Sequence, residues 1–131
     1  MMCITLLFLA NCTNHDIIKE DQETEHPKVN PIRITPDQAK EMMNDENVII
    51  LDVRTQDEFD AGHIENAVLL PYDDILSQHS MVFTNKNQII LIYCRTGRRS
   101  WIAATQLVEL GYTSVYDFGG IIDWQGTVVT S

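Results

Sequence analysis

The chain has 131 residues, enough for one domain, and its 44% hydrophobic content is ordinary for a globular core. Nineteen acidic and nine basic side chains give it a formal net charge of −10, which argues against nucleic-acid binding, because such binding relies on Lys and Arg neutralising phosphates. The three cysteines form neither a CxxC pair nor a Cys/His cluster with zinc spacing, so the sequence predicts no metal site and no cofactor.

Residues 1–12 have the pattern of an export signal. The apolar run Ile4–Ala10 is too short to span a bilayer but fits the hydrophobic part of a signal peptide. The segment Leu9-Ala10-Asn11-Cys12 resembles a bacterial lipoprotein signal, in which the cysteine becomes the lipidated first residue. We therefore expect an exported bacterial protein, either anchored to a membrane through Cys12 or, if the signal is a plain cleaved one, free in the periplasm. Residues 13–31 contain five acids and two prolines and are predicted to be a flexible linker.

From residue 32 onward, short apolar runs alternate with helix signals, which predicts a single α/β domain over residues 32–131. Two capping boxes, Thr35 with Gln38 and Thr55 with Glu58, mark helix starts, and Asp73 or Asp74 is expected to cap a third helix. Predicted strands cover 32–34, 48–51, 67–70, 88–93 and 114–116, and predicted helices cover 36–44, a short stretch after 55, a stretch from about 75, 100–110 and a short turn around 124. This order predicts a mainly parallel sheet of about five strands with helices on both faces.

The loop between the predicted strand 88–93 and the predicted helix 100–110 concentrates positive charge around one thiol. Three of the nine basic residues, Arg95, Arg98 and Arg99, follow Cys94 within five positions. Ligands of parallel sheets bind beyond the carboxyl ends of the strands. A helix N-terminus, the glycine at position 97 and these cations favour a thiolate and create a site for a small anion. A purely structural, buried cysteine would not need three arginines, which are costly to bury unpaired.

On these and other residues, the chain resembles the single-domain rhodaneses, which are thiosulfate sulfurtransferases. The resemblance covers about residues 32–126 and is carried by Asp52-Val53-Arg54, Glu58-Phe59, Gly62-His63-Ile64, Ala67, Cys94–Ser100, Gly119-Gly120 and Trp124. It implies the rhodanese-like three-layer α/β fold. It also implies that Cys94 takes a sulfane sulfur from thiosulfate or a similar donor, holds it as a persulfide, and passes it to cyanide or a thiol.

The resemblance assigns the residues after Cys94 to the substrate. The backbone N–H groups of the loop would surround the persulfide, and its arginine side chains would attract the anionic donor; the residues concerned are Arg95, Thr96, Gly97, Arg98, Arg99 and Ser100. Asp52 and Arg54 are expected to support the loop or to be structural, with Arg54 paired to Glu58 or to a neighbouring carboxylate.

Three further positions have structural interpretations. His63 is expected to be structural, and Trp101 and Trp124 are expected to pack in the core or at its rim. Asn66 stands where the family often has glycine, and asparagine tolerates the left-handed backbone conformation that such a position requires.

Other functions remain as alternatives. A cysteine-dependent phosphatase needs an arginine at the position of Ser100, and Arg99 comes one residue too early. A non-enzymatic sulfur carrier or binding module is a second alternative. A redox role without sulfur transfer is a third, with Cys3 or Cys12 as the second cysteine.

Overall fold

The structure, a computed structural model, describes residues 29–131. The predicted signal segment with Cys3 and Cys12, and residues 13–28 of the predicted linker, lie outside the described residues. Between residues 29 and 131, no helix is long and apolar enough to cross a membrane. The same part of the chain contains no cluster of three metal-ligating side chains.

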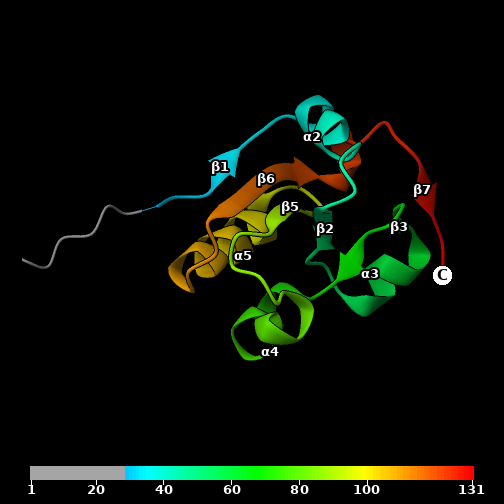
Figure 1. Ribbon diagram of the computed structural model, residues 1–131. Coiled ribbons are helices and arrows are strands. Elements are labelled where there is room, and N and C mark those ends of the chain that lie inside the picture. Colours follow the sequence, from blue (N-terminus) through cyan, green and yellow to red (C-terminus); the bar gives the residue numbers. More distant parts are fainter. Residues whose placement is uncertain (1–28) are drawn as a thin grey trace, which may run out of the picture.

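A parallel sheet forms the middle layer of the fold. Its five strands run in the order β1 (Ile32–Arg33), β6 (Ser114–Gly120), β5 (Ile89–Cys94), β2 (Val48–Asp52) and β4 (Val68–Leu69), and every neighbouring pair is parallel. Helix α2 (Pro36–Met42) covers one face, and α4 (Ile75–Val82) and α5 (Arg98–Glu109) cover the other (Figure 1). The predicted α/β fold, with a mainly parallel sheet and helices on both faces, is confirmed.

Both predicted capping boxes form. In α2, the Thr35 hydroxyl accepts from the Gln38 backbone N–H at 3.1 Å, and the Gln38 side chain accepts from the Thr35 N–H at 2.8 Å. Thr55 and Glu58 make the same pair of bonds at the start of α3 (Gln56–Ala61). Asn66 adopts the predicted left-handed conformation, with φ of 72°.

Two predicted boundaries and one predicted helix cap were wrong. Helix α5 begins at Arg98 instead of Ser100, because the left-handed Gly97 ends the loop earlier. Strand β6 continues to Gly120 instead of ending at Tyr116, because it pairs with β5 up to Asp117 and, after a shift of register, again at Gly120. Asp74 precedes α4 but makes no capping hydrogen bond, since residues Tyr72–Asp74 form a 3-10 turn, η2, that runs directly into the helix.

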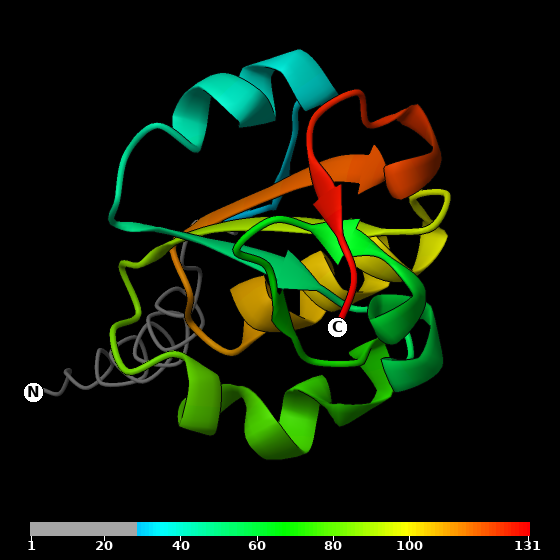
Figure 2. The same ribbon diagram turned by 90° about the vertical axis from the view of Figure 1, so that its right-hand side faces the viewer.

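A second, smaller sheet was not predicted. Strands β3 (His63–Ile64) and β7 (Val128–Val129) pair antiparallel, so the C-terminal segment returns beside the segment that follows α3 (Figure 2). The turn η3 (Ile121–Asp123) joins β6 to this segment. The small sheet and α3 lie at the carboxyl end of the parallel strands, where a ligand of this fold class is expected (Figure 1).

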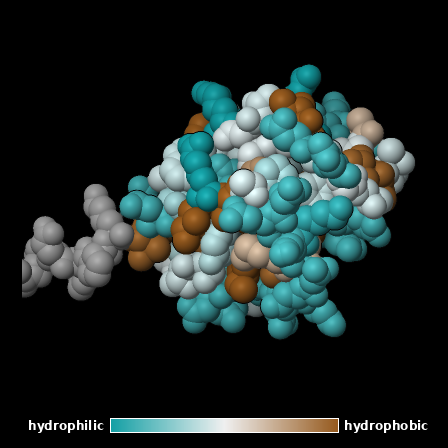
Figure 3. All heavy atoms as spheres, turned by 90° about the horizontal axis from the view of Figure 1, so that it is seen from above, coloured by the Kyte–Doolittle hydropathy of each residue, from teal (hydrophilic) through white to brown (hydrophobic). Residues whose placement is uncertain are grey.

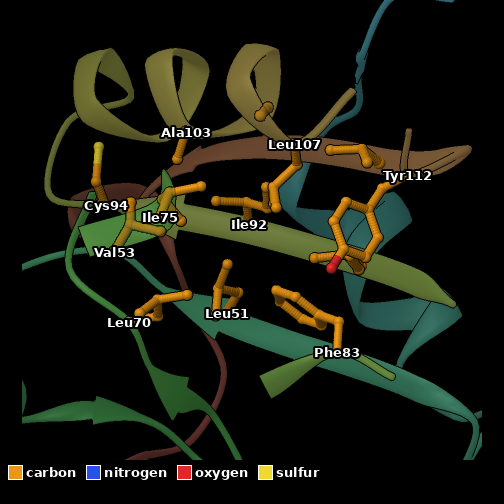
Figure 4. Close-up of a cluster of buried hydrophobic side chains, with 13 residues drawn as sticks. Leu51, Val53, Leu70, Ile75, Phe83, Ile92, Cys94, Ala103, Leu107 and Tyr112 are labelled. Atoms are coloured by element: carbon orange, nitrogen blue, oxygen red, sulfur yellow. The ribbon is translucent and has the colours of Figure 1, made fainter. Parts of the chain in front are cut away.

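Two hydrophobic clusters fill the spaces above and below the parallel sheet. Side chains alternate along the strands, so Leu51, Ile92 and Cys94 face α4 and α5, whereas Leu91 and Tyr93 face α2. Figure 4 shows the first cluster, in which Cys94 lies at the edge beside the loop that leads into α5. The reactive cysteine of the sequence prediction is therefore the outermost member of a packed core layer.

The surface outside the loop offers only scattered apolar residues. On the face seen from above in Figure 3, apolar side chains form small patches that are separated by hydrophilic ones. The most exposed are Met81 at 78% and Leu76 at 61%, both on α4, and Ile122 at 61%, in the turn η3. The charged loop after β5 is therefore the stronger candidate for a binding site.

Candidate active site

Cys94 is the last residue of β5, a central strand of the sheet. Its side chain is 1% exposed, and its sulfur is directed toward the loop that enters α5 (Figure 4). The Gly97 N–H donates a hydrogen bond to the Cys94 Sγ at 3.0 Å. Because α5 begins at Arg98, the N–H groups of its first turn have no intrahelical acceptors, and the positive end of the helix lies at the cysteine loop. This arrangement stabilises negative charge on sulfur.

Two glycines at the end of β6 let the loop lie against the sheet. A Cβ on Gly120 would stand 2.1 Å from the Arg95 carbonyl oxygen, so no larger residue fits there without displacing the loop. A Cβ on Gly97 would stand 3.5 Å from the Gly119 Cα, and both of these glycines have a positive φ. In the Gly119-Gly120 pair, quoted above for the family resemblance, Gly120 thus has a steric role, because it leaves room for the loop, and Gly119 has a conformational one, because its φ is positive.

The three loop arginines differ in their surroundings. Arg95 and Arg98 are exposed, and neither makes an ion pair within residues 29–131. Arg99 is half-buried and binds the Glu58 carboxylate through both guanidinium NH₂ groups, at 2.8 and 2.9 Å. The hydrogen bond from Arg99 lowers the pKa of Glu58 to about 2 and raises the pKa of Arg99. Arg95 and Arg98 are therefore the cations available to an incoming anion, while Arg99 also ties the loop to α3.

Asp52 and Arg54 form a buried network beside the loop. The Arg54 guanidinium donates to both Asp52 carboxylate oxygens, at 2.7 to 3.1 Å, and to the Gly62 carbonyl at 2.7 Å. The Tyr93 hydroxyl donates to Asp52 at 2.5 Å. The pKa of Tyr93 is raised, mainly because the hydroxyl is buried and also because of this hydrogen bond. Of the two predicted partners of Arg54, the structure selects the neighbouring carboxylate Asp52 rather than Glu58. The network joins the end of β2 to the start of β3, and no hydrogen bond within residues 29–131 links it to Cys94 directly.

Ser100 and Asp117 lie beneath the loop. Ser100 is fully buried; its hydroxyl donates to the Asp117 carboxylate at 2.7 Å and lies 3.5 Å from the Cys94 sulfur. Asp117 is 3% exposed and also accepts from the Gly119 N–H at 2.9 Å. Burial raises the pKa of Asp117, although the hydrogen bonds from Ser100 and Gly119 and the charge of Arg33 act in the opposite direction.

Sequence reasoning missed Asp117, because the strand was predicted to end at Tyr116. The available signal was an acidic residue inside an apolar run, two positions before Gly119-Gly120. The register places Asp117 opposite Ile92, which faces α5 as Cys94 does.

The remaining predicted residues have structural contacts. The His63 ring stacks on Phe59 with centroids 3.6 Å apart, and its Nδ1 lies 2.8 Å from the Phe59 carbonyl oxygen. Trp124 packs near Phe118, and Arg33 lies over the Trp101 ring at 4.0 Å. These contacts agree with the structural interpretations of His63, Trp101 and Trp124.

A hollow of about 350 Å³ opens beside the loop. It is lined by Arg54, Glu58, Ala61, Gly62, Arg95, Ile121 and Ile122. A larger hollow of about 520 Å³ lies between α2 and residues 124–127. Cys94 lines neither hollow, but Arg95 of the cysteine loop lines the smaller one. The chemistry of the site favours the smaller hollow, which brings a cation and an apolar wall to the side of the cysteine loop.

Comparison with solved structures places these features in a known fold. A rhodanese with anions from E. coli superposes with a TM-score of 0.61 at 28% identity, over 64% of this chain and 99% of that one. A rhodanese-like domain protein from Staphylococcus aureus gives a TM-score of 0.67 at 34% identity, over 76% of this chain and 98% of that one. The expected rhodanese-like fold is thereby confirmed.

Curated relatives match through part of their length only. The tRNA uridine(34) hydroxylase of Photorhabdus laumondii is 31% identical over 109 residues, which are 79% of this chain and 31% of that protein. The protein of the same name from Yersinia pestis is 32% identical over 93 residues, which are 67% of this chain and 26% of that protein. The chain thus spans less than a third of the length of these relatives. The family model described as "Rhodanese-like domain" matches residues 35–127, which include four of the five strands of the parallel sheet, the cysteine loop and the Gly119-Gly120 pair: the chain belongs to the rhodanese-like domain family.

Proposed function

We propose that this protein is a sulfurtransferase that carries a sulfane sulfur as a persulfide on Cys94. The main support is the position of the Cys94 sulfur, which receives the Gly97 N–H at 3.0 Å at the positive end of α5. Membership of the rhodanese-like family supports sulfurtransferase-type chemistry. The choice of thiosulfate, or a similar anion, as donor is the finer part of the proposal.

The transfer balances without a cofactor. The Cys94 thiolate attacks the outer sulfur of thiosulfate, a new S–S bond forms, and the original S–S bond breaks, so that sulfite leaves with the bonding electron pair. Cyanide or a thiolate then attacks the outer sulfur of the persulfide, and the Cys94 thiolate leaves. The loop N–H groups would stabilise the anionic sulfur in every state, because thiolate and persulfide are both anions.

Charge selects the donor in this proposal. The whole chain, loop arginines included, carries a net charge of −10, which repels anions at long range. Arg95 and Arg98 are exposed beside the sulfur and would offset that repulsion locally for a small dianion. A polyanion such as tRNA would also face the acidic remainder of the surface. For this reason, and because the match to the tRNA uridine(34) hydroxylases covers less than a third of their length, we do not extend their activity to this chain.

The deciding experiment is the intact mass of the full chain after incubation with thiosulfate and then with cyanide. We expect a gain of one sulfur atom that cyanide removes, with release of thiocyanate. Cys94→Ser should show no gain, whereas Cys12→Ser should load normally. No gain in the wild type, together with hydrolysis of an aryl phosphate that Cys94→Ser abolishes, would replace this proposal with the phosphatase alternative.

Export is a separate proposal that rests on the sequence alone. We propose that Cys12 is lipidated and that the domain acts outside the bacterial cytoplasm, tethered through residues 13–31. Cys12→Ser should move the protein from the membrane fraction to the soluble fraction of its bacterial host. A wild-type protein that is already in the soluble fraction would contradict the anchor.

A further inference from the structure

A buried acid lies next to the proposed nucleophile. Nothing in the sulfur-transfer chemistry above uses Asp117, yet it is 3% exposed and lies one hydroxyl group away from the cysteine. The 3.5 Å from the Cys94 Sγ to the Ser100 Oγ and the 2.7 Å from that oxygen to Asp117 place the carboxylate oxygen within about 6 Å of the sulfur. Burying a carboxylate is costly, so its presence here calls for a function.

Ser100 has one hydroxyl proton, and the Asp117 carboxylate at 2.7 Å is the nearest of its possible acceptors. The others are the Gly97 carbonyl at 3.1 Å, the Gly119 carbonyl at 3.4 Å and, when it is anionic, the Cys94 sulfur at 3.5 Å. When Asp117 is ionised, its carboxylate accepts a hydrogen bond from that hydroxyl at 2.7 Å, and only the lone pairs of Ser100 remain for Cys94. When Asp117 is neutral, it accepts the hydrogen bond from Ser100 less strongly, and the Ser100 hydroxyl can rotate to donate to an anionic sulfur. The second donor to Asp117, the Gly119 N–H at 2.9 Å, is part of the backbone and stays in place in both states.

We propose that Asp117 is a positioning residue that acts through Ser100 to set how strongly the loop stabilises an anionic sulfur on Cys94. Ionised Asp117 holds the Ser100 hydroxyl in a hydrogen bond and adds a negative charge near the sulfur. Both effects destabilise an anionic Cys94 sulfur. Neutral Asp117 removes that charge and releases a donor to the sulfur. The extension to the persulfide rests on the proposed sulfurtransferase function, whereas the effect on the free thiol does not.

Other charged groups face this pair and bear on its pH dependence. Arg33, from β1, acts electrostatically on Asp117. Arg99, from α5, acts on Cys94; it is bound to Glu58 of α3, and Tyr72 also faces it. The proposed substitutions leave the ion pair between Arg99 and Glu58 in place, so its effect on Cys94 is the same in the wild type and in the variants.

The test compares the wild type with Asp117→Asn. The asparagine carbonyl oxygen can still accept from the Gly119 N–H, and it accepts from Ser100 more weakly than a carboxylate does, so the substitution removes the charge and loosens the hold on the Ser100 hydroxyl while the shape is kept. The measurement is the rate of iodoacetamide alkylation against pH, followed by mass spectrometry on the peptide that contains Cys94. We expect the midpoint of the Asp117→Asn profile to move down by about 0.5 to 2 pH units, which is the range for two charges about 6 Å apart as the effective dielectric constant falls from 80 to 20.

Two controls make the shift specific. Asp123→Asn removes an exposed charge close to the same end of β6 and should leave the midpoint unchanged. With Ser100→Ala as the background, Asp117→Asn should shift the midpoint by less than it does in the wild type, because the hydroxyl that links the two groups is gone. An equal shift in the two backgrounds would overturn the role of Ser100.

No shift with Asp117→Asn, or an upward shift, would overturn the proposal as a whole. If Asp117→Asn does not fold, Asp117→Ser removes the same charge and should give the same downward shift. If the wild type does not take up sulfur from thiosulfate but the alkylation midpoint shifts as expected in Asp117→Asn, the proposed function is rejected and this inference still holds.

Discussion

The ion pair between Glu58 and Arg99 leads to a sharp prediction, because one substitution separates its charge from its capping role. Glu58 accepts two hydrogen bonds from Arg99, at 2.8 and 2.9 Å, and one from the Thr55 N–H that begins α3. Glutamine can make the same cap, as Gln38 does with Thr35 at the start of α2. Glu58→Gln should therefore remove the ion pair and keep the helix start.

The magnitude follows from the pKa of Glu58, which is about 2 in the fold against an ordinary value of 4.5, chiefly because of the hydrogen bond from Arg99. A shift of that size corresponds to about 3 kcal/mol if taken at face value. The Arg99 and Glu58 side chains are 21% and 29% exposed, so solvent screening reduces the contribution to about 1–2 kcal/mol. Because Glu58 is more acidic folded than unfolded, this stabilisation is present above pH 4.5 and is lost as the pH falls toward 2.

The assay is urea unfolding of the wild type and Glu58→Gln across that pH range. We expect the variant to be less stable by about 1–2 kcal/mol near neutral pH and equal to the wild type at the acid end of the range. Glu41, an exposed acid in α2, has no ion pair with any other residue of 29–131, so Glu41→Gln should match the wild type throughout. A deficit of Glu58→Gln that is the same at both ends of the range would refute the reasoning, because it would not come from the charge.

Three further predictions concern the loop and its surroundings. Gly120→Ala should destabilise the fold by about 1–3 kcal/mol and abolish sulfur loading, because its Cβ would stand 2.1 Å from the Arg95 carbonyl oxygen. Thermal unfolding measures the loss of stability and intact mass measures the loading. Normal loading of the variant would contradict this prediction. Arg95→Gln combined with Arg98→Gln should raise the KM for thiosulfate about tenfold in steady-state assays. Lys86→Gln, at the other end of β5, should leave that KM unchanged, and an equal effect of both changes would mean that only net charge matters. Asn66→Val should cost about 1–2 kcal/mol in urea unfolding because the position has a φ of 72°, whereas Asn66→Gly should cost little; equal losses would remove backbone conformation as the cause.

Local sequence signals predicted the parts of this protein that depend on neighbouring residues. The capping boxes at Thr35 and Thr55 are formed by side chains three positions apart, so their pattern is readable without a fold. The left-handed Asn66 is likewise a local preference. The alternation of strands and helices predicted the parallel sheet, and the sheet predicted that the loop after Cys94 would lie at its carboxyl edge.

Boundaries were predicted less well, because they depend on pairing. Strand β6 reaches Gly120 only because β5 lies beside it up to Cys94, and no local signal in the run from Ser114 records that neighbour. The same error hid Asp117, whose side chain was not expected in a strand. The small sheet of β3 and β7 joins segments more than sixty positions apart and left no pattern in either of them.

The sequence by itself therefore determined the α/β class, the place of the cysteine loop and the concentration of arginines around Cys94. Only the tertiary structure decided the partners of the charged and polar groups. Glu58 and Arg99 are 41 positions apart and Ser100 and Asp117 are 17 apart, and each pair meets because α3 and α5 begin, and β6 ends, at the same edge of the sheet. A carboxylate can pair with any cation that the fold brings within reach, so its choice of partner is a property of the packed strands and helices and not of the residues around it.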